Sequence, residues 1–147
     1  MSFSRGADPG FGLRIVSLVM GLFLVCMGLS KLAWFTDSDI LTAQLCEWLD
    51  TAGPASRWYL ETVAIPGAPI FARLVPLGEL ATGTALVCGS WVRLAATVAL
   101  LMVANFHFAA DILLHLNYLI NGYGPPVLGS LLALAIGGRR LPVSVSR

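Results

Sequence analysis

The sequence predicts an all-α fold, an integral membrane four-helix bundle with an amphipathic helical segment between its first two spans. Hydrophobic residues make up 57% of the 147-residue chain. Charged residues make up only 12%, about half the fraction of an average soluble protein. The apolar residues gather in four stretches, at residues 13–35, 69–88, 92–116 and 126–138. We therefore expect one membrane domain over residues 1–147.

The first stretch, residues 13–35, resembles either a retained span or a cleaved signal peptide, because Arg5 and Arg14 precede an apolar run. A signal peptide has an apolar core of about 7–15 residues and a small-residue exit. This run is longer, carries Lys31 near its end and has no such exit. We interpret it as a retained membrane span, since about 20 residues cross the hydrocarbon core.

Residues 36–68 form the largest segment outside the predicted spans. Its apolar residues recur at helical spacing after the capping residues at 37–39. They are Ile40, Leu41, Leu45, Trp48 and Leu49. This pattern is typical of an amphipathic helix, which either lies on the outer membrane surface or packs on the bundle as a lid. The lid is the favoured interpretation.

The second and third spans, 69–88 and 92–116, are joined by a tight connection at residues 89–92. The fourth, 126–138, is shorter, because the glycines and prolines at 121–126 must form a turn before it. Short cytoplasmic loops are enriched in Lys and Arg. With four spans, six arginines share one side, and they are Arg5, Arg14, Arg93, Arg139, Arg140 and Arg147. We therefore expect both termini in the cytoplasm and residues 36–68 outside, in a bacterial or archaeal cytoplasmic membrane.

Glu79 lies deep inside the second apolar stretch. A charged side chain at the bilayer centre costs about 2.5–3.5 kcal/mol on insertion scales, so it needs a partner or a function. Thr82 and Gly83 share its helical face, which suits a close helix neighbour. Arg73 is a poor partner within the same helix, whereas Lys31, near the end of the first span, is a better one. Two interpretations stay open, a structural contact between helices and a proton-handling group at a quinone-like site.

The third span contains His107, Asp111 and His115 at positions i, i+4 and i+8, which would place them on one helical face. Three interpretations remain open: metal binding, a proton or quinone-headgroup role, and simple polarity at the membrane surface. Asn105 lies on another face and is expected to form a hydrogen bond to a neighbouring helix.

Other classes of function lack support in the sequence. There is no glycine-rich phosphate loop, haem-attachment motif or nucleophile elbow. The three cysteines form no Cys-x-x-Cys pair, and we expect no metal site and no covalently bound cofactor. A net charge of +1 argues against nucleic acid as a partner. Any redox role would have to be shared with a partner that carries electrons.

Several polar positions resemble the DoxX/DoxD family of small four-helix membrane proteins. The first span has Arg14 and a Gly-x-x-Lys at residues 28–31, and the second has the glycine-rich block 78–89 around Glu79. Arg93 then opens the third span. Residues 58–72 are similar to the longer first loop of the DoxD-like branch. The resemblance covers about residues 14–138 and departs from the family at the extension 107–111 and in the short tail after Arg140.

The resemblance implies a membrane subunit associated with a quinone-linked redox complex, such as the DoxD subunit of thiosulfate:quinone oxidoreductase. For such a site we expect Glu79 and His107 as catalytic proton handlers, with Phe106, Phe108 and Tyr118 shaping the pocket. We further expect Lys31, Arg73 and Asp111 to bind the quinone. The alternative is a non-catalytic accessory or scaffold subunit that packs against other respiratory or photosynthetic membrane subunits in the lipid bilayer.

Overall fold

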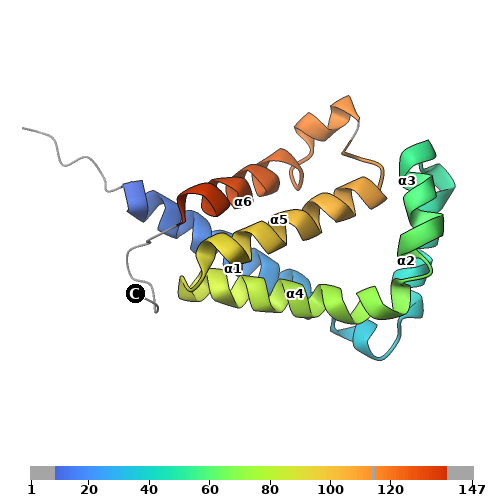
Figure 1. Ribbon diagram of the computed structural model, residues 1–147, viewed down its shortest axis with the longest axis horizontal. Coiled ribbons are helices and arrows are strands. Elements are labelled where there is room, and N and C mark those ends of the chain that lie inside the picture. The colour runs from blue at the N-terminus through green and yellow to red at the C-terminus, as the bar shows by residue number, and fades with distance from the viewer. Residues whose placement is uncertain (1–8, 114, 139–147) are drawn as a thin grey trace, which may run out of the picture.

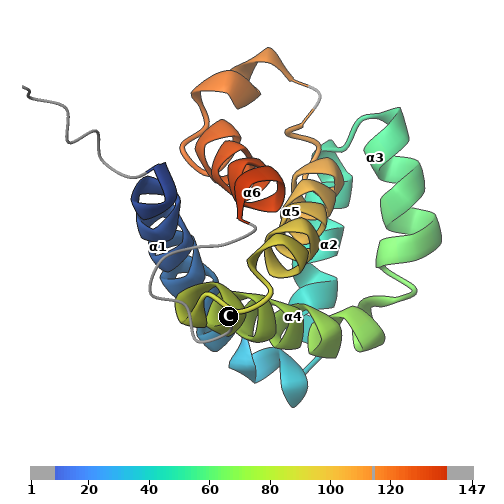
Figure 2. The same ribbon diagram turned by 60° about the vertical axis from the view of Figure 1, so that its left-hand side comes forward.

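The computed structural model describes residues 9–113 and 115–138, and within these residues all regular structure is helical. The long helices are α1 (Pro9–Ser30), α4 (Ala68–Cys88), α5 (Val92–Ala109) and α6 (Pro125–Gly137). Each packs against two of the others, because α1 and α5 both contact α4 and α6 (Figures 1 and 2). The all-α prediction is confirmed.

Three of these helices are long and apolar enough to cross a membrane, namely Gly10–Ser30, Ala68–Cys88 and Val92–Ala109. α6 is apolar but has only 13 residues, which is about 20 Å at 1.5 Å per residue. Large apolar side chains on the outer faces of all four are exposed, such as Leu22 (61%), Leu101 (64%) and Ile136 (69%). A helix surface of this kind suits contact with lipid, as expected of a multi-pass membrane protein.

The interior contains two apolar clusters. One fills the space between the four long helices and is rich in small residues, including the fully buried Ala96 and Ala99 of α5. The other joins the N-terminal end of α4 to the helices of residues 36–68. Small side chains let helix backbones approach closely, which is how helices pack without a hydrophobic driving force in lipid.

The segment between α1 and α4 begins with a short 3₁₀ turn, η1 (Leu32–Phe35). It continues as α2 (Asp39–Thr51), α3 (Pro54–Tyr59) and a π-helical turn, η2 (Leu60–Ala64). α2 and α3 lie across one end of the bundle (Figure 1). Leu41 and Leu45 of the predicted apolar stripe are buried. This end is called the lid end below.

The close approach of α1 and α4 depends on two glycines. A Cβ added to Gly21 of α1 would lie 2.8 Å from the Gly83 carbonyl oxygen, and one added to Gly83 would lie 2.8 Å from the Gly21 carbonyl oxygen. Pro76 does not end α4, which continues through it to Cys88. The turn from α4 to α5 is as short as predicted, with Gly89 in the left-handed conformation at φ 72°.

The third predicted span is too long, because α5 ends at Ala109 and not near residue 116. Asp111 adopts a left-handed conformation, φ 55°, which an α-helix does not accommodate. The first span also ends earlier than predicted, at Ser30. The predicted cytoplasmic Arg5, Arg139, Arg140 and Arg147 lie outside the described residues.

We predict that Gly83→Ala destabilises the bundle, because the new methyl group must push α1 and α4 apart. Overpacking of this kind costs about 1–3 kcal/mol. The thermal unfolding midpoint in detergent micelles measures the effect.

Gly129→Ala on α6 is the matched control, since a Cβ there would meet nothing within 4 Å. We expect its midpoint to equal or exceed that of the wild type. Equal midpoints for the two variants would contradict a tight α1–α4 contact.

Candidate functional site

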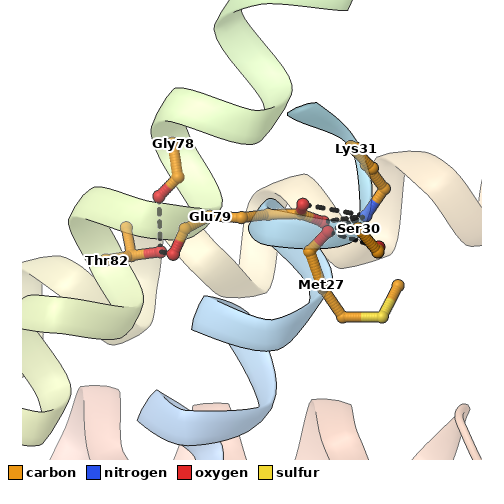
Figure 3. A network of polar contacts seen from close by, with 6 residues as sticks. All are labelled: Met27, Ser30, Lys31, Gly78, Glu79 and Thr82. Atoms are coloured by element: carbon orange, nitrogen blue, oxygen red, sulfur yellow. Dashed lines mark hydrogen bonds and ion pairs between the residues drawn. The ribbon is translucent and has the colours of Figure 1, made fainter. Parts of the chain in front are cut away.

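Lys31 and Glu79 form a buried ion pair between the end of α1 and the middle of α4 (Figure 3). The Lys31 Nζ atom donates to Glu79 Oε1 at 2.6 Å and to Oε2 at 2.8 Å. The lysine side chain is 12% exposed and the glutamate side chain 7%. The predicted partnership between these two residues is therefore confirmed. The lysine charge offsets part of the free-energy cost of burying the Glu79 carboxylate at this depth.

The local sequence explains how the pair forms. Glu79 belongs to a buried stripe of α4 that also includes Pro76, Thr82 and Gly83, and this stripe faces α1. Lys31 follows the last residue of α1, and its Nζ atom also lies 3.4 Å from the Met27 carbonyl oxygen. From this position just beyond α1, the Lys31 side chain bridges to Glu79 on α4.

Aromatic rings surround the lysine ammonium group. Its Nζ atom lies 5.7 Å from the ring centroid of Trp34 in η1 and 5.9 Å from that of Phe106 in α5. Contacts of this length between a cation and a ring are attractive and gain strength where water is excluded. The charge of Lys31 is therefore compensated by both the carboxylate and the two rings.

The ion pair lies on the wall of a partly open pocket of about 210 Å³ at the lid end of the bundle. Rings and aliphatic groups from α1, η1, α2, α5 and α6 form most of the lining. The lining residues are Phe23, Leu24, Met27, Lys31, Trp34, Gln44, Trp48, Glu79, Val103, Phe106, His107, Tyr123 and Val127. An apolar lining with a few convergent polar groups is typical of a small-molecule site. Pockets for drug-sized ligands span about 300–1,000 Å³, so this one suits a single ring.

His107 reaches the same pocket from the last turn of α5 and is 9% exposed. Its Nδ1 atom is hydrogen-bonded to the Tyr118 hydroxyl at 2.9 Å, and the two rings meet edge to face. Nε2 is then the ring nitrogen that is available to the pocket. The structure thus brings together Lys31, Glu79 and His107, three of the predicted site residues.

The predicted common face of His107, Asp111 and His115 does not form, because α5 ends before Asp111. The Asp111 carboxylate instead accepts hydrogen bonds from the Gly53 backbone N–H and the Ser56 hydroxyl, both at 2.8 Å. Only the contact between Asp111 and His115 remains, at 3.3 Å. In the described part of the chain no group of three or more His, Cys, Asp or Glu side chains is placed to hold a metal ion.

Asp111 therefore anchors α3 to the bundle. The hydrogen bond from the Gly53 N–H, followed by those from Ser56 and His115, holds the pKa of the Asp111 carboxyl below its ordinary value. These donors stabilise the ionised form, and their effect outweighs the opposing effect of burial.

Arg73 does not join the site. Its side chain is exposed, and its Nη1 atom donates to the Pro69 carbonyl oxygen of its own helix. Of the predicted pocket aromatics, only Phe106 lines the pocket; Phe108 packs against Tyr59, and Tyr118 lies behind His107. The predicted hydrogen bond of Asn105 exists, since its side-chain oxygen accepts from the Tyr59 hydroxyl at 2.7 Å.

Sequence reasoning missed several lining residues, including Phe23, Trp34, Gln44 and Tyr123. For Trp48 the sequence predicts only a place in the apolar stripe of residues 36–68. A signal was present, because Trp34 is three residues after Lys31, close enough to cover its ammonium group. The other residues come from distant segments, and nothing in the local pattern joins them.

Two arginines that match polar positions of the DoxX/DoxD pattern, Arg14 and Arg93, donate hydrogen bonds to backbone carbonyls near helix ends. Arg14 donates to the carbonyl oxygens of Leu86 (3.1 Å) and Val87 (2.7 Å), near the end of α4. Arg93 donates to the Ala135 carbonyl oxygen of α6 at 2.9 Å. Carbonyls in the last turn of a helix have few partners within it, so each arginine adds a donor there and joins two helices.

Comparison with known proteins gives one match. The family model described as DoxX matches residues 11–112, well over half of the chain. This range contains the pair Lys31–Glu79 together with His107 and Asp111. No curated protein and no solved structure matches the chain.

We predict that Lys31→Met destabilises the protein by about 3–5 kcal/mol, because it leaves the Glu79 carboxylate buried without a partner. The free energy of unfolding in detergent measures the loss. The double variant Lys31→Met/Glu79→Leu is the control, and it should recover most of the stability because it removes both charges. A Lys31→Met protein as stable as the wild type would show that the pair contributes little.

We predict that Asp111→Asn lowers the unfolding midpoint at neutral pH and that the difference from the wild type narrows in acid. The pKa of Asp111 is lower in the folded protein, so its stabilising effect is full above the ordinary pKa. The effect disappears as the pH falls through the lower, folded value. Unfolding midpoints of both proteins between about pH 7 and pH 3 test this, and a constant difference would contradict it.

Proposed function

We propose that this chain, which belongs to the DoxX family, binds the ring of a membrane quinone in the pocket beside Lys31 and Glu79. In this proposal it is a membrane subunit of a quinone-linked redox complex. The observation that carries the proposal is the placement of a buried ion pair on the wall of an aromatic pocket within an apolar helix bundle.

The chemistry of the pocket suits a quinone. A quinone ring is flat and apolar and carries carbonyl oxygens that accept hydrogen bonds. Trp34, Trp48 and Phe106 offer ring surfaces for stacking. Lys31 and His107 offer donors to the carbonyl oxygens, while the Glu79 carboxylate can accept a hydrogen bond from the hydroxyl of the reduced ring.

The pocket volume suits the quinone ring but not its hydrophobic tail. About 210 Å³ accommodates one substituted ring, and the partly open side leaves the hydrophobic tail outside the pocket. Exposed apolar helix faces around the bundle would place that tail in lipid. Reduction of the ring to a quinol takes up two electrons and two protons. In this proposal a partner subunit supplies the electrons, and Glu79 and His107 handle protons.

The proposal includes a topology with four spans, in which α6 is a short fourth span. Arg14 and Arg93 lie at the bundle end opposite the lid, which the positive-inside rule assigns to the cytoplasm. Asp37, Asp39 and Glu47 lie in or next to the lid helices. Both termini would then be cytoplasmic in a bacterial or archaeal cytoplasmic membrane, with the pocket near the outer surface.

A second candidate function is a non-catalytic accessory subunit that packs against a larger membrane complex. The hydrogen bonds of Arg14 and Arg93 favour this candidate, because in both cases a polar residue joins two helices of the bundle and lies outside the pocket beside Lys31 and Glu79. Under this hypothesis the Lys31–Glu79 pair only holds α1 to α4, and no quinone binds.

We predict saturable quenching of tryptophan fluorescence when a benzoquinone with a ten-carbon tail is added to the purified protein. Trp34 and Trp48 line the pocket, so Trp58 and Trp91 are first replaced by Phe to remove their signal. In this background Glu79→Gln should weaken binding at least tenfold, because it disturbs the Lys31 donor and removes the carboxylate acceptor.

Glu61→Gln is the matched control, since Glu61 is an exposed carboxylate that lies 3.8 Å from the Nη1 atom of Arg57, outside the pocket. Its affinity should equal that of the parent protein. Quenching that does not saturate, or that is equal in the Glu79→Gln protein, would overturn the quinone site and favour the accessory subunit.

A further inference from the structure

His107 and Tyr118 connect two pockets. His107 lines the quinone pocket, whereas Tyr118 lines a second pocket of about 230 Å³ together with Ile112, His115, Asn117 and Asn121. The hydrogen bond between His107 Nδ1 and the Tyr118 hydroxyl, 2.9 Å long, crosses the partition between them. The two side chains are therefore a continuous hydrogen-bonded path from one pocket to the other.

The second pocket is partly open to the outside of the chain at the lid end. Asn117 is exposed beside it, and the His115 side chain is 63% exposed. His115 Nε2 lies 3.3 Å from the Asp111 carboxylate, so a titratable pair stands next to the pocket. The exposed imidazole of His115 is a polar ring that can hydrogen-bond to water at the mouth of this pocket.

Among the described residues, His107 is one of four titratable side chains that line the quinone pocket. The titratable groups that line it with His107 are Lys31, Glu79 and Tyr123. Lys31 and Glu79 are nearly buried and bonded to each other. Tyr123 is an exposed phenol.

We propose that Tyr118 and His107 form a proton path that joins the aqueous phase at the lid end to the quinone in the pocket. His107 is the group that touches the quinone, and Tyr118 acts through it. This inference rests on the proposed function, and it adds the side of the membrane from which the protons come.

Each proton transfer along the path balances. The N–H bond at His107 Nε2 breaks as its proton moves to an oxygen of the reduced ring. His107 Nδ1 takes the hydroxyl proton of Tyr118, and Tyr118 takes a proton from water in the second pocket. The net change is one proton moved from water to the ring, while the electrons arrive separately from the partner redox subunit. Burial raises the pKa of Tyr118, so its hydroxyl keeps a proton to donate at neutral pH.

The path can be tested without quinone, because the chain has only two histidines. Protein labelled with nitrogen-15 in histidine gives two sets of ring signals, which His115→Asn assigns. We expect the ring N–H of His107 to exchange with water at least tenfold more slowly in Tyr118→Phe than in the wild type, because the ring of Phe fills the same space but cannot pass a proton.

Tyr59→Phe is the matched control. It removes another tyrosine hydroxyl that is hydrogen-bonded to α5, but this hydroxyl donates to Asn105 and not to His107. Its exchange rate should equal that of the wild type. Unchanged or faster exchange in Tyr118→Phe would overturn the path, since Tyr118 would then only shield the ring.

Sidedness is tested in sealed phosphatidylcholine vesicles with different pH inside and outside, with protein orientation read from labelling of the exposed Cys46 on α2. The exchange rate of His107 should follow the pH of the compartment that faces α2, and dependence on the other compartment would also overturn the path. The proposed function fails separately if quinone does not quench the tryptophan fluorescence while the exchange rate of His107 still depends on Tyr118.

Discussion

The requirement that a buried carboxylate be paired determines how the bundle is built. Glu79 lies in the middle of an apolar helix. Without a partner, its buried charge would destabilise the protein by more than most single interactions stabilise it. Lys31 lies just after Ser30, the last residue of α1, and it pairs with Glu79 across the close contact between α1 and α4. That contact depends on Gly21 and Gly83, whose backbones touch where side chains would separate the helices. The ion pair, the glycines and the end of α1 are thus one structural unit.

The same unit creates the pocket. Lys31 leaves the helix axis to meet Glu79, and the chain then turns through η1, which brings Trp34 over the ammonium group. α5 and α2 complete the wall with Phe106, His107 and Trp48. A charged pair in an aromatic enclosure stabilises the fold whether or not a ligand binds. A structural role and a binding role for Glu79 are therefore compatible, because each depends on the same short contact.

The break in α5 after Ala109 has a comparable effect at the lid end. Asp111 turns away from the helix and binds Gly53 and Ser56, which fastens α3 across the end of the bundle. The chain that follows is then free to fold back, and η3 (Leu116–Ile120) places Tyr118 against His107. A continuous helix through residue 116 would have carried these residues along the α5 axis, away from the pocket.

The sequence by itself determined the all-α membrane character, the approximate positions of the apolar helices and the pairing of Glu79 with Lys31. The first two follow from the composition and from the length of each apolar stretch, which can be read from a single segment. The third follows from the high cost of an unpaired charge in lipid, which few residues of the chain could offset. Only the tertiary structure decided where α5 ends, because the donors that hold Asp111 lie on α3, more than fifty residues away. The tertiary structure also decided which residues line the pocket, since Phe23, Gln44 and Tyr123 come from separate segments and meet only after packing. Local periodicity tells which face of a helix is apolar, but a site made of several elements depends on helix ends and close approaches set by distant residues.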